Sequence, residues 1–199
     1  MFQLTAPSED QIRRFISAQH ELPFSYPKVG ASAGNPPTEY NVNHNRIELG
    51  YGLIAWQRAI EAIRGWQMFN IPWLRLCWPT APIRVGTEVA ILVRHFGFYS
   101  LNACRIVYLI DNDAGTKRFG FAYGTLEEHA ERGEERFTVE WHQASDKVYY
   151  DILAFSRPRK MLALLGYPLS RFLQKRFAED SQAAMLRFVV GDSKRGDHS

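Results

Sequence analysis

The chain has 199 residues, of which 46% are hydrophobic and 23% are charged, a composition typical of a globular protein rather than a disordered or membrane-embedded one. Its formal net charge is +3, far from the strongly basic balance of a nucleic-acid-binding domain, so we expect no nucleic-acid partner. The segment 157–199 is more basic, with nine Lys or Arg against four Asp or Glu, but these charges are spread along it. We interpret them as the solvated face of a helix.

The sequence contains no apolar run of about 18 residues and no basic-then-apolar leader, so we expect a cytoplasmic protein without a transmembrane segment. Cys77 and Cys104 lie in apolar surroundings, which is typical of reduced thiols in a core. Weak peripheral contact between the basic C-terminal helix and an anionic membrane is a minor alternative. The oligomeric state stays open.

The first third of the chain is predicted to contain one helix and a long irregular segment. Ser8 and Gln11 have the spacing of a capping box, which predicts a helix that runs to about His20. Residues 22–45 are rich in Pro, Gly, Ser and Asn, so we expect irregular structure there, either a lid or a packed segment. The stretch 47–50 is typical of a short strand end.

Leu53, Trp56, Ile60 and Ile63 then recur at helical spacing, which predicts an amphipathic helix over 53–66. After this helix apolar residues recur at every second position instead of at helical spacing, which predicts a run of strands. The expected strands are Leu74–Trp78, Thr87–Phe96, Asn102–Ile110, Lys117–Thr125, Glu135–His142 and Lys147–Phe155.

Turns are predicted between the paired strands, and a long helix is predicted after them. Asp111–Gly115 and Ala144–Asp146 have turn composition, and Val89, Ile91 and Val93 share one face of their strand. Helical spacing returns from about Pro168 to Val190. We therefore expect an N-terminal helix over 1–21, one α+β domain over 22–190 and a flexible tail over 191–199.

This order of elements favours a curved antiparallel sheet of about six or seven strands around a long C-terminal helix, because the helix buries the concave face of the sheet. The order resembles the START-like, or Bet v 1-like (SRPBCC), helix-grip topology. The resemblance implies an apolar cavity between the sheet and the last helix.

The motifs of the chain resemble those of the UPF0548 (DUF1990) family, a domain of unknown function. The blocks that carry this resemblance are Tyr26–Ala31, Leu49–Gly52, Cys104–Tyr108, Gly120–Leu126 with His129, Gly133–Phe137 and Ala154–Pro158. They stand in the family's order from about Tyr26 to Met185. The resemblance implies one domain of helix-grip fold, and it implies no activity.

The segment 120–137 contains the candidates for catalysis, with a histidine and a pair of glutamates in what reads as a polar loop between two strands. His129 or Glu134 is suited to act as an acid or base, and Tyr123 to donate a proton. The alternative, which we favour, is a polar hairpin loop in which Glu134 pairs with Arg132 or Arg136. The spacing matches no metal motif, so we expect no metal and no other cofactor.

Other side chains are candidates for ligand binding. The hydroxyls of Tyr26, Tyr51 and Ser156 stand beside glycine or proline in the family blocks, and they either orient a ligand or bond within the core. For Arg105 we expect first an internal ion pair with Glu88, Glu134 or Glu135, then exposure, and third a ligand carboxylate. The aromatic candidates for a cavity lining are Trp66, Trp73, Phe121, Tyr123, Trp141, Phe172 and Phe177.

Three functional hypotheses follow from these residues. The first is a small protein that binds an apolar or amphipathic molecule, lipid-like or polyketide-like, between sheet and helix. The second is an enzyme on the same scaffold, such as a cyclase, dehydratase or hydrolase, that uses His129 or Glu134 as acid or base. The third is an interaction module that presents residues 26–40 and the basic helix to a protein or membrane surface.

Overall fold

A computed structural model of the chain describes residues 1–158 and 167–191. Three helices lie in this part, α1 (Glu9–Gln19), α2 (Gly52–Arg64) and α4 (Tyr167–Gly191), with short 3-10 turns η1 (Ala31–Ala33) and η2 (Gln67–Phe69). None of the helices in the described part is long and apolar enough to cross a membrane. The flexible tail predicted over 191–199 falls outside the described residues, except for Gly191.

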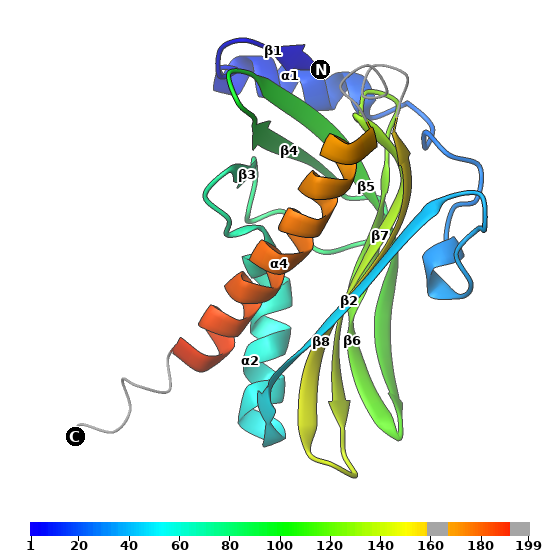
Figure 1. Cartoon of the computed structure of the whole chain (residues 1–199), viewed down its shortest axis with the longest axis vertical. Helices are drawn as coiled ribbons and strands as arrows, with labels where there is room; N and C mark the ends of the chain where they lie inside the picture. Colours follow the sequence, from blue (N-terminus) through cyan, green and yellow to red (C-terminus); the bar gives the residue numbers. More distant parts are fainter. Residues whose placement is uncertain (159–166, 192–199) are drawn as a thin grey trace.

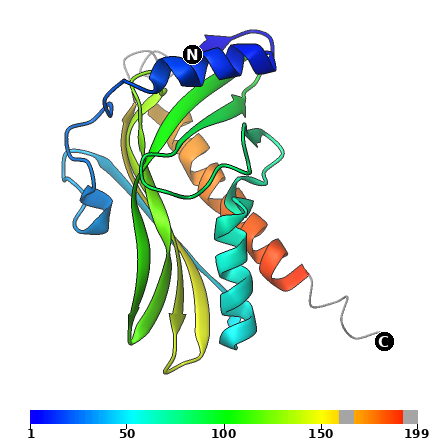
Figure 2. The same cartoon turned by 180° about the vertical axis from the view of Figure 1, so that it is seen from behind.

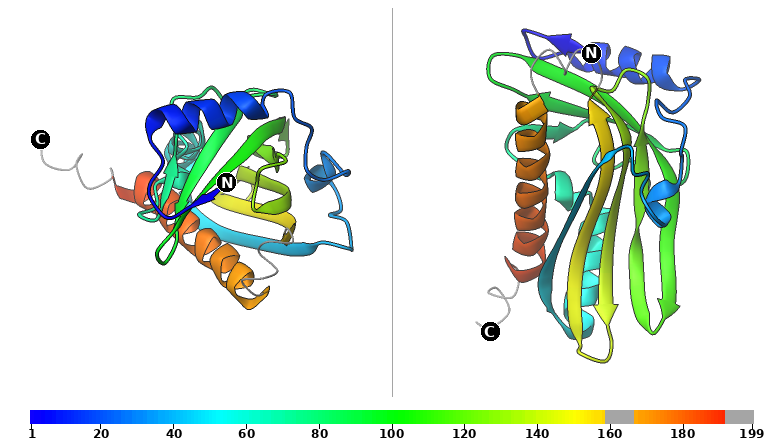
Figure 3. Two further views of the ribbon diagram at one scale, coloured as in Figure 1. Left: turned by 90° about the horizontal axis from the view of Figure 1, so that it is seen from above. Right: turned by 45° about the vertical axis from the view of Figure 1, so that its right-hand side comes forward.

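A curved antiparallel sheet forms the body of the molecule (Figure 1). Among the described residues its strands follow the order β2-β8-β7-β6-β5-β4-β3, and β1 (Phe2–Gln3) pairs with β5 beside this path. The other strands are β2 (Asn41–Tyr51), β3 (Leu74–Leu76), β4 (Glu88–Arg94), β5 (Tyr99–Ala114), β6 (Thr116–Thr125), β7 (Glu131–His142) and β8 (Lys147–Pro158). Viewed from above, the sheet curves around the helices (Figure 3). The predicted helix-grip architecture is therefore confirmed.

The concave face of the sheet is buried by α2 and α4, which run along it together (Figures 1 and 2). Trp56 and Ile63 of α2 and Met185 of α4 belong to one buried cluster with Phe121 and Phe137 of the sheet. A fully buried Val, Leu, Ile or Phe side chain contributes roughly 1.5–3 kcal/mol, so this cluster is the main source of stability.

A smaller core lies on the opposite face of the sheet, under α1. Ile12 and Phe15 of this helix pack with Leu92 of β4 and Leu101 of β5. Strand β4 is therefore covered on both faces, which explains why nearly all of its residues are apolar. The predicted capping box at Ser8 and Gln11 is confirmed at the start of α1.

Strand β2 corrects the prediction of irregular structure up to residue 45. It begins at Asn41 and pairs with β8 from Asn41↔Ser156 onward, so it is an eleven-residue edge strand. Its first half lacks alternating apolar residues because Asn43 and Asn45 contribute to the wall of a cavity that is partly polar. The sequence therefore lacks the apolar alternation that would predict a strand over residues 41–45.

Two expected loops are shorter than predicted. Asp111 to Ala114 continue β5, and the reversal falls on Gly115, whose φ of 75° suits glycine. The polar loop expected around His129 ends at Ala130, because β7 begins at Glu131 and pairs there with Pro158. Glu134 therefore lies within a strand and not in a loop.

Candidate functional site

A cavity of about 190 Å³ lies between the sheet and the N-terminal half of α4. The helix contributes Leu173, Phe177 and Ala178 to the wall, and strand β8 contributes Ile152 and Ala154. The rest of the wall includes Phe69, Trp73, Leu74, Ile91 and Val93. The concave face of the sheet is therefore filled where α2 and the C-terminal half of α4 pack on it, and it forms a hollow groove beside the N-terminal half of α4.

Tyr123 and Glu135 form a polar pair on the wall of this cavity. The two residues are directly opposite each other on β6 and β7, so their side chains share the concave face. The Tyr123 hydroxyl donates to Glu135 Oε2 at 2.8 Å. Burial raises the pKa of Glu135 to about 7, although the Tyr123 hydrogen bond acts in the opposite direction. Burial also raises the pKa of Tyr123 well above its ordinary value, so the tyrosine stays a donor.

A second polar group at the cavity centres on Gln174 of α4. Its amide nitrogen lies 2.9 Å from each carboxylate oxygen of Glu131 and 2.8 Å from Ser156 Oγ. Its amide oxygen accepts from Asn43 Nδ2 at 2.9 Å and from Arg171 Nη1 at 3.1 Å. This amide therefore joins α4 to strands β2, β7 and β8 at the cavity wall.

His129 lies in the short loop between β6 and β7 and also contributes to the cavity wall. The backbone N–H of Glu131 lies 2.9 Å from His129 Nδ1, and the Glu131 carbonyl oxygen lies 3.1 Å from the same ring nitrogen. Asn102 of β5 also holds the loop, because its side-chain oxygen accepts from the backbone N–H of Ala130 at 3.1 Å. The histidine is thus positioned by its own loop.

Glu134 points to the opposite, convex face of the sheet. It accepts from the Tyr26 hydroxyl at 2.6 Å, from the backbone N–H groups of Gly30 and Ser32 at 2.7 and 2.9 Å, and from the Ser32 hydroxyl. These donors come from residues 24–33, which we call the strap. Four donors on one buried carboxylate make Glu134 an anchor for the strap, with Arg136 adding a bond from Nη1 to the Ser32 carbonyl at 2.9 Å.

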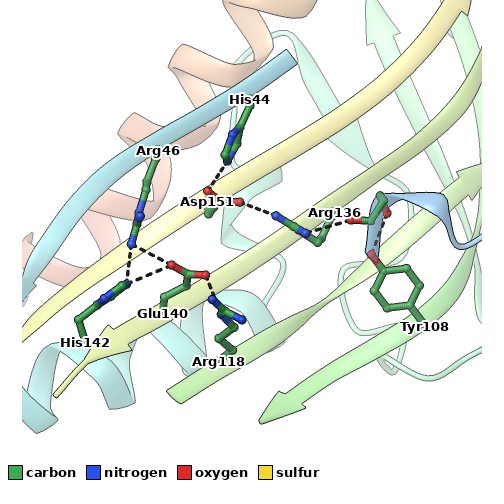
Figure 4. A network of polar contacts seen from close by, with 9 residues as sticks. His44, Arg46, Tyr108, Arg118, Arg136, Glu140, His142 and Asp151 are labelled. Atoms are coloured by element: carbon green, nitrogen blue, oxygen red, sulfur yellow. Dashed lines mark hydrogen bonds and ion pairs between the residues drawn. The ribbon is translucent and has the colours of Figure 1, made fainter. Parts of the chain in front are cut away.

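The convex face also carries a ladder of ion pairs (Figure 4). Asp151 accepts from Arg136 Nη2 at 3.0 Å and lies 2.6 Å from His44 Nε2. Glu140 accepts from Arg46 and Arg118 at 2.8 and 2.9 Å. The buried carboxylates of this face are therefore all matched by cations or by several donors, in contrast with Glu135 on the concave face.

Of the side chains predicted from the sequence, Tyr123, His129 and Ser156 reach the cavity, as do Trp73 and Phe177. Tyr26 lies in the strap, and Arg105 pairs with Glu88 at 2.7 Å, so the internal ion pair is confirmed. Glu134 also borders the cavity, although its carboxylate binds the strap, and the other candidates lie away from the wall. Trp66 and Phe121 pack together in the filled core, Trp141 stacks near Trp56 at its far end, and Tyr51 and Phe172 are more than half exposed.

Sequence reasoning assigned the acid–base position to Glu134 and missed Glu131 and Glu135, whose carboxylates lie at the cavity. The signal was present, because Phe137, Val139 and Trp141 share a face, and the period of two continues back to Glu135. No three His, Cys, Asp or Glu side chains in the described part of the chain are grouped so that they could hold a metal ion.

The molecule is a helix-grip α+β domain whose groove is filled at one end and hollow, with polar side chains, at the other. The domain of unknown function DUF1990 matches residues 25–184. A UPF0548 protein of Dictyostelium discoideum is 36% identical over all of both chains, and one of Deinococcus radiodurans is 36% identical over 94% of this chain and 98% of its own. The chain belongs to the UPF0548 (DUF1990) family.

Solved structures align with the chain at low sequence identity. A hypothetical protein of Helicobacter pylori aligns with a TM-score of 0.50 and 12% identity over 86% of this chain and 96% of its own. Human STARD10 aligns with a TM-score of 0.46 and 11% identity over 98% of this chain and 86% of its own. At these identities the likeness concerns the chain path alone.

Proposed function

We propose that the protein binds a small amphipathic molecule in the cavity between the sheet and α4. The observation that carries this proposal is the cavity itself, which combines an apolar wall with two convergent polar groups, Tyr123–Glu135 and Gln174–Glu131. Sites for small molecules have this combination, in which apolar side chains supply affinity and a few polar groups fix the orientation.

The size of the cavity limits the occupant. Its volume of about 190 Å³ is below the range of about 300–1,000 Å³ common for drug-sized ligands and slightly above the roughly 150 Å³ of an engineered cavity that holds benzene. The volume therefore favours a molecule built on about one ring, or one end of a longer chain, over an entire lipid.

Binding can be tested with benzyl alcohol, a neutral amphipathic probe of this size, by recording backbone amide NMR spectra during a titration. The proposal predicts shifts concentrated at the cavity wall, around Tyr123, Glu135 and Leu173. In Ala154→Phe, a phenyl ring fills the cavity from β8, and these shifts should disappear. Absence of any shift in the wild type, or the same shifts in a folded Ala154→Phe protein, would contradict the proposal.

A second candidate function is acid–base catalysis in the same cavity, which the pKa of about 7 for Glu135 favours. In this case Glu135, and not Glu134, exchanges a proton with the bound molecule. Mass spectrometry of molecules recovered from wild-type protein and from Glu135→Gln separates the two functions. An enzyme would convert its ligand in the wild type and retain it unchanged in the variant, whereas a binding protein would return the same molecule from both.

A further inference from the structure

The half-buried carboxylate of Glu135 differs in its partners from the carboxylates of the convex face and of Glu88. Glu140, Asp151 and Glu88 each contact an arginine, and Glu134 accepts four hydrogen bonds. Glu135 accepts one, from Tyr123 to Oε2, and no described residue bonds to Oε1. Glu135 contributes to the cavity wall, so a molecule in the cavity would lie beside this carboxylate.

Glu135 shares the described part of the cavity wall with two histidines, His95 and His129, and with no residue that is always cationic. Among the described residues, the cavity wall contains neither lysine nor arginine. Arg171, on the same turn of α4 as Gln174, bonds to the Gln174 oxygen and is not part of this wall. Glu131 lies close enough to raise the pKa of Glu135 further.

An acidic group enclosed in this way is costly when it is ionised without a cation. From its single donor and its place on the wall we infer that the ligand carries a cationic nitrogen, such as a primary ammonium group on a one-ring apolar body, and that this nitrogen binds Glu135. The inference rests on the proposed binding function and names the ligand class of the same cavity. A ligand of this class completes the pairing that arginine supplies to the carboxylates elsewhere in the sheet, while its ring contacts Phe177 and Trp73.

The tyrosine has a defined part in this arrangement. Because Tyr123 donates to Oε2, it holds the carboxylate in place and leaves Oε1 for the ligand. An ammonium group donates and does not accept, which fits an oxygen acceptor. An anionic ligand would meet the repulsion of Glu135 and Glu131 in the same cavity.

The test compares three probes of nearly equal shape at pH 8, namely benzylamine, benzyl alcohol and benzoate, with dissociation constants measured by NMR titration. A charged hydrogen bond to Glu135 predicts that benzylamine binds the wild type about tenfold or more tightly than benzyl alcohol, and that benzoate binds most weakly. Glu135→Gln should remove the preference for the amine, so that the amine and the alcohol bind about equally. Tyr123→Phe should weaken the preference without removing it, because the carboxylate keeps its charge and loses the hydrogen bond that holds it in place.

The outcomes separate the two proposals. If benzyl alcohol binds and benzylamine binds no more tightly, the cationic ligand class is wrong and the cavity function stands. If none of the three probes binds, both proposals fail. A further measurement uses the wild type alone and so does not depend on a variant that folds. If the charge of Glu135 gives benzylamine a tenfold preference, benzylamine must lower the pKa of Glu135 by about one unit. This pKa can be measured from the ¹³C carboxyl shift of Glu135. A pKa that does not move on saturation with the amine overturns the inference.

Discussion

Two adjacent glutamates have opposite roles because a strand directs successive side chains to opposite faces. Glu134 lies on the convex face with four donors around its carboxylate, and Glu135 lies on the concave face with one. The first carboxylate holds the strap to the sheet, and the second faces the cavity. Identical side chains at neighbouring positions therefore provide a natural pair for comparison.

Glu134→Gln is predicted to lower the free energy of unfolding by about 2–4 kcal/mol, because the variant leaves buried donors of the strap without a charged acceptor. Glu135→Gln, the matched control, should change stability at pH 5 by less than about 1 kcal/mol, since the native glutamate is largely protonated there. Urea unfolding at pH 5 measures both. Equal losses in the two variants would show that Glu134 is not an anchor.

The stability of the protein should also depend on the charge of Glu135. Its pKa is raised by burial from 4.5 to about 7, so the native state holds this proton more tightly than the unfolded state. The contribution to stability is fully present below pH 4.5 and is lost as pH rises through 7, and it amounts to at most about 3 kcal/mol.

Urea unfolding of the wild type and of Glu135→Gln at pH 5 and pH 8 isolates this contribution, because the variant retains every other titrating group. The wild type should lose stability relative to the variant between the two pH values. A difference that stays constant, or one that grows in favour of the wild type at pH 8, would contradict the raised pKa.

At the scale of elements, the strap explains why glycine occupies position 124. A Cβ atom there would lie 2.9 Å from Phe24 Cδ1 and closer still to the Tyr26 hydroxyl, so only glycine lets the strap pack on β6. The strap is further held by an isolated bridge between Phe24 and Leu126. Gly124 of β6 and Tyr26 of the strap, which belong to separate sequence blocks, are therefore in direct contact.

Gly124→Ala is predicted to lower the free energy of unfolding by about 1–3 kcal/mol through overpacking. It should also increase amide hydrogen exchange across residues 24–33, because the strap must shift outward. Gly191→Ala is the control, since a Cβ at the end of α4 meets no atom within 4 Å. If amide exchange in the strap of Gly124→Ala were unchanged, the packing of Tyr26 on β6 would not require glycine at position 124.

The elements that the sequence predicted well are those with an uninterrupted apolar period. Helix α2 and strands β4, β7 and β8 have such a period, and their predicted ranges overlap the observed ones. Strand β2 was missed in its first half because Asn43 and Asn45 point to the partly polar cavity, where apolar residues are not required. The two asparagines that break the apolar alternation in the sequence are thus also part of the cavity wall in the structure.

At the scale of the molecule, the order of elements was sufficient to predict a curved sheet around a C-terminal helix, because few arrangements bury both amphipathic faces. The position of the cavity was not predictable in this way. Trp66 and Phe121, which the sequence favoured as lining, fill the core against α2, whereas the wall of the hollow end combines other aromatic residues with small ones such as Ala154 and Ala178. Which aromatic residues fill space and which surround it depends on contacts between distant segments.

Binding of a small molecule at this hollow end can be measured by native mass spectrometry of wild-type protein and of Ala154→Phe, both purified from the host of origin, with extraction of any bound molecule. We predict that the wild type carries an amphipathic molecule of about one ring that is absent from the variant. Wild-type protein that is bare, or a molecule that stays bound to Ala154→Phe, would contradict a binding site between the sheet and α4.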